Sequence, residues 1–169
     1  MKTTIPQILE EVQRQTKKDQ QIKVLKTYDS PVLRGILKLN FDSNYKMDLP
    51  EGEPPFRKDI RTPEGYSDTN LYVEFRRFYI WTEQKLNLSR ARKEVLFIQM
   101  LEGLHWKEAE LLCLAKDKKL QTKFDKVTES IVREAFYDLL PKEPIPPKKF
   151  RDIVVSKNEV KNNSSVPNT

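Results

Sequence analysis

The sequence predicts an all-α fold with about seven short helices, divided into two units by a long, ordered, proline-rich loop. Apolar residues recur at three- and four-residue spacing on both sides of the loop, and residues that favour helix N-caps precede several of these stretches. The loop holds four of the eleven prolines and two of the four glycines. We expect one helical domain over residues 1–140, made of an N-terminal unit (4–41), the loop (42–68) and a C-terminal unit (69–140), followed by a flexible basic and polar tail (141–169).

Three short helices are predicted in the N-terminal unit. Thr4 is expected to cap the first helix with Gln7 reaching back to it, and Pro6 is compatible with a first helical turn. Ser30 and Pro31 have the residue types of an N-cap and the first position of the third helix. The apolar residues at helical spacing are Ile5, Ile8, Leu9 and Val12 in the first helix, Ile22, Leu25 and Tyr28 in the second, and Leu33, Ile36 and Leu37 in the third.

The proline-rich loop contains the same tripeptide twice, as Pro50-Glu51-Gly52 and as Pro63-Glu64-Gly65. Each copy is typical of a turn with proline at its second position and a glycine that takes a positive φ. Connections of this length in compact domains are usually functional or disordered. Six apolar residues favour an ordered loop that packs on the core: Tyr45, Met47, Leu49, Phe56, Ile60 and Tyr66.

The C-terminal unit begins at Thr69 and Asn70 with a helix predicted to run to about Lys85. Its aromatic and β-branched content leaves a strand as the alternative, but Arg77 interrupts the alternation that a strand requires. We therefore favour a helix. The residues expected on one face are Leu71, Phe75, Phe78, Tyr79 and Thr82.

Three further helices are predicted after this segment. Ser89 is expected to cap one that ends at Gly103, and His105 stands at the start of the next. Thr128 is expected to cap the last helix, which Pro141 ends. The residues expected to face the core in the last two helices are Ala109, Leu112 and Cys113, then Ile131, Val132, Ala135, Phe136 and Leu139; Leu120 and Phe124 anchor the charged connection between them.

Composition gives only weak indications of function. The single cysteine, Cys113, excludes an intramolecular disulfide and a multi-cysteine zinc site. No apolar run approaches the ~18 residues of a membrane helix, and the start of the chain lacks a signal-peptide pattern. We therefore expect a protein that acts inside the cell and not at a membrane. The net charge of +6 is compatible with nucleic-acid binding but does not require it.

No strong catalytic motif is present, and we predict no enzyme activity and no cofactor. His105 is the only histidine and is best placed to cap a helix, while Cys113 lies within an apolar stretch and resembles a core residue. The one catalytic alternative is a metal-dependent nuclease. Such enzymes have an acidic residue followed later in the chain by an acid-x-lysine tripeptide, and Asp68 followed by Glu83-Gln84-Lys85 has the same pattern. That chemistry usually presents the last acid and the lysine from a strand, and the pattern is common by chance.

Basic residues gather at two places. Arg90, Arg92 and Lys93 follow the Ser89 cap, where cations oppose the helix dipole unless they pair with acids or bind an anion. A second group lies at the end of the following helix. The candidate contacts to DNA or RNA are Arg90, Arg92, Lys93, Lys116, Lys118, Lys119 and Lys123.

The stiff proline loop and the tail are candidate protein contacts, because a rigid loop loses little entropy on binding. An alternative interpretation is that the loop only covers the core. The candidate partner-binding residues are Pro50, Gly52, Pro54, Pro55, Phe56 and Phe150.

Five sequence blocks carry a resemblance to a known family: 49–56 (LPEGEPPF), 63–65 (PEG), 97–105 (FIQMLEGLH), 115–120 (AKDKKL) and 132–136 (VREAF). In their order they resemble a family of small proteins encoded by tailed bacteriophages, chiefly T-even-like myophages of marine bacteria. The resemblance covers roughly residues 5–140. It implies a phage origin and a setting in the host cytoplasm, and it assigns no catalytic or binding residue.

The expected function is that of a non-enzymatic phage accessory protein, which binds nucleic acid or assists phage nucleic-acid metabolism. The alternative is a protein–protein interaction module, either a virion or assembly component or an inhibitor of a host protein, that uses the proline loop and the tail. The sequence leaves the oligomeric state open.

Overall fold

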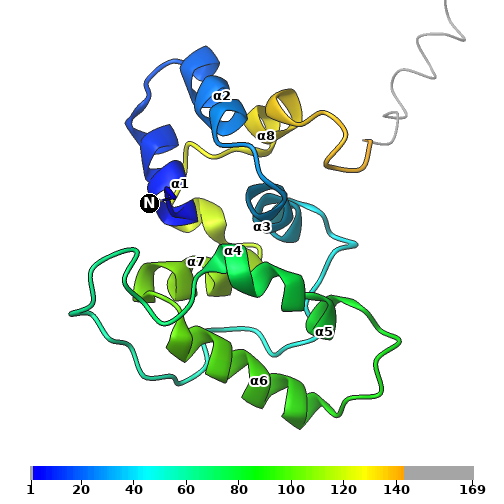
Figure 1. Cartoon of the computed structure of the whole chain (residues 1–169). Coiled ribbons are helices and arrows are strands. Elements are labelled where there is room, and N and C mark those ends of the chain that lie inside the picture. Colours follow the sequence, from blue (N-terminus) through cyan, green and yellow to red (C-terminus); the bar gives the residue numbers. More distant parts are fainter. Residues whose placement is uncertain (1, 143–169) are drawn as a thin grey trace, which may run out of the picture.

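Residues 2–142 are described by the computed structural model, and this part of the chain is helical and contains no strand (Figure 1). The elements in chain order are α1 (Ile5–Arg14), α2 (Lys18–Thr27), α3 (Pro31–Phe41), α4 (Leu71–Glu74), the 3-10 turn η1 (Phe75–Arg77), α5 (Tyr79–Thr82), α6 (Arg90–Gly103), α7 (Trp106–Lys116), the 3-10 turn η2 (Leu120–Thr122) and α8 (Glu129–Ala135). These elements confirm the predicted helical fold class. Within these residues, no helix has the length and apolar character needed to cross a bilayer.

Helix starts follow the predicted N-cap residues. The Thr4 hydroxyl accepts from the backbone N–H of Gln7, whose side chain accepts from the backbone N–H of Thr4, so the capping box is complete. The hydroxyls of Ser30, Ser89 and Thr128 each accept a hydrogen bond from the backbone N–H three residues later. Each cap satisfies an N–H group that a helix start leaves without a partner.

Helices from both ends of the chain share one apolar core. Helix α8 packs on α2, and α7 packs on α3 and α1, so the first three helices are joined to the last two (Figure 1). Of the core residues expected in and just after α8, Ile131, Val132 and Phe136 are buried, and Ala135 and Leu139 are partly buried against the core. The helix itself ends at Ala135, well before Pro141, because Phe136 adopts a non-helical backbone conformation.

The segment from Leu71 to Thr82 is helical, as favoured over the strand, but it is divided into α4, η1 and α5. A 3-10 turn has three residues per turn and changes which side chains face inward after it. As a result Trp81 is buried and Tyr79 is 48% exposed, so the predicted inward position of Tyr79 is wrong. Ahead of this change, the ring of Phe75 packs directly over Gly35 of α3, where a Cβ atom would stand 2.6 Å from the ring Cζ.

The loop between α3 and α4 is tied to the core at several points. The backbone N–H of Asp48 donates to the carbonyl oxygen of Trp81 over 2.8 Å, and Met47 is buried. Tyr45, Leu49 and Phe56 are half-buried against the core. The expectation that all six apolar loop residues pack inward fails for Ile60 and Tyr66, which are exposed.

Both Pro-Glu-Gly glycines have the expected positive φ, 96° at Gly52 and 89° at Gly65. In the second copy the backbone N–H of Tyr66 donates to the carbonyl oxygen of Pro63, so Pro63 is the first residue of the turn and not the second, as predicted. Gly65 then holds the third position, where a type II turn requires positive φ.

Candidate functional site

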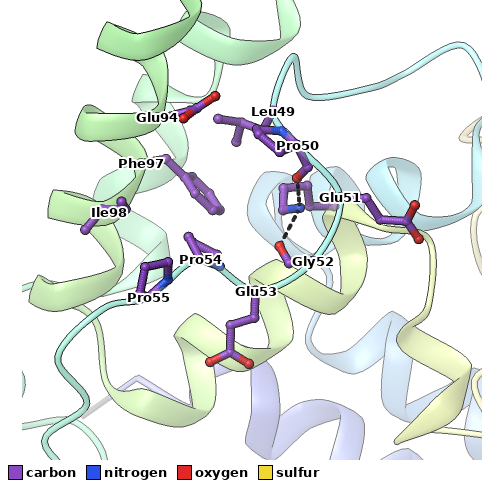
Figure 2. Close-up of a pocket in the computed structure, with 11 residues that line it drawn as sticks. Leu49, Pro50, Glu51, Gly52, Glu53, Pro54, Pro55, Glu94, Phe97 and Ile98 are labelled. Carbon is purple, nitrogen blue, oxygen red and sulfur yellow. Dashed lines mark hydrogen bonds between the residues drawn. The ribbon is translucent and has the colours of Figure 1, made fainter.

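A pocket of about 350 Å³ lies between the first half of the loop and helix α6 (Figure 2). Phe97 and Ile98 of α6 form one wall, and Phe97 points toward Pro54 on the opposite side. The lining is mainly apolar and comprises Leu49, Pro50, Glu51, Gly52, Glu53, Pro54, Pro55, Glu94, Phe97, Ile98 and Lys116. Four of the predicted partner-binding residues, Pro50, Gly52, Pro54 and Pro55, are therefore brought together in one place.

The other two predicted partner-binding residues do not line this pocket. Phe56 is half-buried against the core, with Lys58 Nζ 5.3 Å from its ring centre. Phe150 lies outside the described residues.

Lys116 holds the wall of the pocket in place. Its side chain is 2% exposed, and its ammonium group donates to the carbonyl oxygens of Pro50 (2.8 Å) and Gly52 (3.1 Å). The same ammonium group pairs with Asp117 at 2.6 Å, and Asp117 accepts from the backbone N–H of Gly52 at 2.9 Å. Lys116 and Asp117 together clamp the first Pro-Glu-Gly segment, so the pocket has a fixed shape before anything binds.

Three carboxylates stand among the lining residues. Glu51 pairs with Lys119 at 2.8 Å, Glu53 pairs with Lys58, and Glu94 lies 3.8 Å from Arg90. The hydrogen bond from Lys119 holds the pKa of Glu51 below its usual value. All three acids are more than a third exposed, so a cationic partner group could replace their present partners at little cost.

Two further lysines of the predicted nucleic-acid set use their ammonium groups inside the protein. Lys118 donates to the carbonyl oxygens of Leu39, Asp42 and Tyr45, and burial lowers its pKa. The side chain of Lys93 is 6% exposed and pairs with Asp48 at 2.9 Å. Both residues therefore secure the loop, in the same manner as Lys116.

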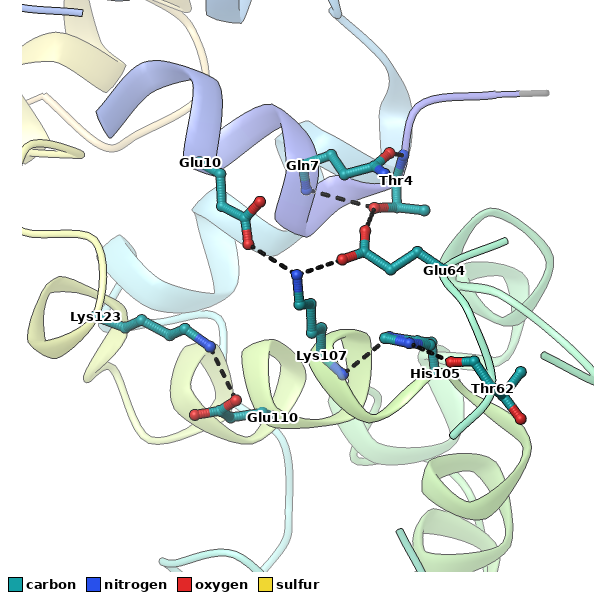
Figure 3. A network of polar contacts seen from close by, with 9 residues as sticks. All are labelled: Thr4, Gln7, Glu10, Thr62, Glu64, His105, Lys107, Glu110 and Lys123. Carbon is teal, nitrogen blue, oxygen red and sulfur yellow. Dashed lines mark hydrogen bonds and ion pairs between the residues drawn. The ribbon is translucent and has the colours of Figure 1, made fainter. Parts of the chain in front are cut away.

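The remaining four predicted cations are exposed. Arg90 and Arg92 lie in the first turn of α6, and Lys119 and Lys123 lie after α7. Lys123 pairs with Glu110 at 2.9 Å (Figure 3). The structure thus divides the predicted set into groups that secure the loop and groups that reach solvent.

The residues of the nuclease alternative lie at opposite ends of one segment. Asp68 precedes α4, and Glu83 is the C-cap of α5. Glu83 lines a different surface hollow, together with Gln84 and Lys93. Within residues 2–142, no group of three or more His, Cys, Asp or Glu side chains is arranged to hold a metal ion.

A polar network that the sequence analysis did not anticipate joins α1, the loop and α7 (Figure 3). Lys107 pairs with Glu10 at 3.4 Å and with Glu64, and Glu64 accepts a hydrogen bond from the Thr4 hydroxyl. His105 caps α7 through Nδ1, which accepts from the backbone N–H of Lys107, while Nε2 lies 3.0 Å from the carbonyl oxygen of Thr62.

Next to this network, Glu108 is buried in the first turn of α7. The sequence does contain a signal for this residue, because Glu108 stands three and four positions before Leu111 and Leu112 and so falls on the apolar face of the helix.

Residues 8–122 match the model of a family of unknown function, DUF6433. The match covers more than half of the chain. The chain belongs to this family. The DUF6433 match runs from α1 to the end of η2, so it includes the whole proline loop, the pocket against α6 and Glu108, and it stops before α8. A search among curated proteins gives no match.

Proposed function

We propose that this protein is a non-enzymatic protein–protein interaction module that binds its partner in the pocket between the proline loop and α6. The observation that carries the proposal is the apolar pocket of about 350 Å³ whose loop wall is clamped by Lys116. Pockets that bind ligands are usually preformed and apolar, with a few polar groups that fix orientation. A clamped wall also lowers the entropy lost on binding.

The chemistry of the pocket defines the partner segment. The apolar walls suit one leucine-sized or aromatic side chain, and the carboxylates of Glu51, Glu53 and Glu94 suit a lysine or arginine next to it. Burial of one such apolar side chain contributes about 1.5–3 kcal/mol. We therefore propose a short partner segment in which an apolar residue is flanked by basic residues.

Because the chain resembles small phage proteins, we propose that it acts during phage infection. The partner would be a phage or host protein met in the host cytoplasm. The role would be that of a virion or assembly component, or of an inhibitor of a host protein.

Selection of a random peptide library on the full chain tests the chemistry directly. We expect selected peptides to carry an apolar residue beside Lys or Arg. Ile98→Lys, which removes an apolar wall residue and places a positive charge in the pocket, should weaken their binding by roughly 10- to 100-fold, the factor that corresponds to losing one buried apolar side chain. The matched control is Val95→Lys on the same helix, because Val95 is 44% exposed and does not line the pocket.

Two results would reject the proposal. One is a selection that enriches no common motif. The other is a set of peptides that bind Ile98→Lys as tightly as the wild-type chain. A version of the chain that ends at Lys142 shows in addition whether the segment around Phe150 competes with the peptides, since that segment also places Lys and Arg beside an aromatic residue.

Nucleic-acid binding is the second candidate function, favoured by the exposure of Arg90 and Arg92 in the first turn of α6. Unpaired N–H groups at a helix start and nearby arginines together suit a phosphate group. In this proposal Arg90 and Arg92 make the main contacts and Lys119 and Lys123 add charge. Lys93, Lys116 and Lys118 contribute indirectly, because their ammonium groups hold the loop.

Fluorescence anisotropy with labelled single- and double-stranded DNA and RNA, at about 50 and 200 mM salt, tests this candidate. We expect micromolar binding at low salt that falls steeply at high salt and weakens in Arg90→Ala/Arg92→Ala. The control is Lys23→Ala/Lys26→Ala on α2, which removes the same charge from another exposed site. Absence of binding at low salt, or equal weakening by both double variants, would count against a site at α6.

A further inference from the structure

Glu108 carries a buried oxygen atom that has no partner among residues 2–142. The residue is 2% exposed, and within this part of the chain its Oε1 accepts no hydrogen bond. The carboxyl group accepts a hydrogen bond from the backbone N–H of Leu71. A buried carboxylate is costly unless its oxygens are hydrogen-bonded or its charge is balanced. Glu108 therefore requires a proton or a bound cation.

A cavity of about 260 Å³ opens beside this carboxyl group, and it is separate from the loop pocket. Its walls come from the N-terminal segment, the end of the proline loop, α4 and α7. The lining residues are Lys2, Thr4, Gly65, Ser67, Thr69, Asn70, Tyr72, Val73 and Glu108.

The side chains around Glu108 supply no counter-charge. Lys107 is already engaged by Glu10 and Glu64, and Lys2 is exposed with its ammonium group 4.0 Å from the centre of the Tyr72 ring. Burial raises the pKa of Glu108 to about 7, and the negative charge of Glu64 adds to this effect. On α4, Glu74 accepts a hydrogen bond from the Thr69 hydroxyl and pairs with Arg77.

We propose that this cavity binds a small organic cation, a primary ammonium or guanidinium group, whose N–H groups donate to Glu108 Oε1 while its alkyl part lies against Tyr72. The volume suits a ligand of the size of an arginine or lysine side chain. The Lys2 ammonium group already lies 4.0 Å from the centre of the tyrosine ring, so a chain of this type, an alkyl stem that ends in a cation, fits against that ring. This site is separate from the proposed partner-binding pocket, because none of the residues that line the loop pocket lines this cavity.

Binding becomes stronger with rising pH in this scheme, because the ligand requires the ionised carboxyl group. With a pKa of about 7, roughly one molecule in ten carries the charged Glu108 at pH 6 and about nine in ten at pH 8. The apparent dissociation constant should therefore fall roughly tenfold between pH 6 and pH 8. An alkylammonium or alkylguanidinium ligand stays fully protonated over this range, as the side chains of lysine and arginine do.

NMR titration of the full chain with butylammonium and with butylguanidinium tests the proposal. At pH 8 we expect saturating shifts of the amide signals of 65–73 and 105–109, with a dissociation constant on the order of 1 mM for ligands of this size. The neutral probe 1-butanol should cause no saturating shift there. Glu108→Gln keeps the shape of the side chain and should weaken binding at least tenfold.

Glu110→Gln is the matched control, because it removes a carboxylate from the same helix outside the cavity. Its affinity for both cations should equal that of the wild-type chain. The proposal is overturned if neither cation saturates these signals at pH 8, if 1-butanol binds as well as the cations, or if Glu108→Gln binds them with unchanged affinity.

Discussion

The ammonium group of Lys116 donates a hydrogen bond to the carbonyl oxygen of Pro50 across 2.8 Å, although the two residues are 66 positions apart in the sequence. This contact joins the end of α7 to the middle of the proline loop. Lys118 and Lys93 make comparable contacts to other parts of the same loop. Three lysines thus fix the first half of a connection that contains no regular helix.

The first prediction concerns this clamp. Lys116→Met removes the donor, so that two loop carbonyl groups lose their partner and Asp117 loses its counter-charge while it keeps the hydrogen bond from the Gly52 N–H. Breaking a buried ion pair by removing one member costs about 3–5 kcal/mol. We expect a loss of that order in the free energy of unfolding, measured by urea denaturation. Lys119→Met is the control, because that lysine is 54% exposed and its loss should change stability much less than the loss of Lys116. Equal effects of the two substitutions would show that the clamp does not form.

The second prediction concerns the contact between α3 and η1. Gly35→Ala places a methyl group against the ring of Phe75, far inside van der Waals distance. Overpacking of this kind costs about 1–3 kcal/mol, against a gain of about 1 kcal/mol in helix propensity. We expect a net loss of thermal stability. In a Phe75→Leu background the clash is relieved, so Gly35→Ala should there be neutral or stabilising. A loss that is equal in both backgrounds would mean that the ring does not cause it.

Sequence signals that act over three or four residues predicted the helices well. Thr4, Ser30, Ser89 and Thr128 each cap the helix expected of them, because a cap depends only on a hydroxyl and an N–H three residues later. The change of face after η1 could not be predicted in this way. It occurs where Phe75 packs on Gly35, which lies 40 positions earlier in the sequence and is beyond the reach of local signals.

The candidate site was predicted only on its loop side. Pro50, Gly52, Pro54 and Pro55 are distinctive in sequence, whereas the α6 wall of Phe97 and Ile98 looks like any apolar helix face. The basic residues could not be sorted from the sequence either. From the sequence, Lys116 and Lys118 are expected to be surface charges, and only the fold shows that their ammonium groups bind loop carbonyl groups.

The third prediction follows from the raised pKa of Glu108. Its carboxyl group has a pKa of about 7 in the folded chain and about 4.5 in the unfolded chain, so the folded state binds more protons between these values. Stability should therefore fall as pH rises from about 5 to 8, by an amount on the order of 1–3 kcal/mol for this group. Glu108→Gln should remove that part of the pH dependence in urea denaturation, and Glu110→Gln should retain it. An unchanged slope in Glu108→Gln would contradict the prediction.

The fourth prediction concerns the single cysteine. Cys113 is 3% exposed, and burial raises the pKa of its thiol to about 12. Because the thiolate is the reactive form, we expect a disulfide reagent to modify the folded chain at least about 100-fold more slowly than the urea-unfolded chain at pH 8. The measurement is the release of thionitrobenzoate over time. Similar rates in the two states would place the thiol at the surface.

The fifth prediction is an asymmetry within the Lys93–Asp48 pair. The Lys93 side chain is 6% exposed and that of Asp48 is 55% exposed, so the two partners differ in what their loss leaves behind. Asp48→Ala leaves a buried ammonium group without its counter-charge, and we expect it to cost about 1–3 kcal/mol. Lys93→Met instead fills the buried position with an apolar chain, while Asp48 turns to water, so the cost should stay below about 1 kcal/mol.

Urea denaturation of the two single variants and of the double variant measures this asymmetry. In the double variant the cost of Asp48→Ala should largely disappear, because no buried charge is left. The hydrogen bond from Lys93 holds the pKa of Asp48 below its usual value, so the advantage of the wild-type chain over Asp48→Ala should shrink as pH falls below about 4. If Lys93→Met proves as costly as Asp48→Ala or more costly, the predicted asymmetry is wrong.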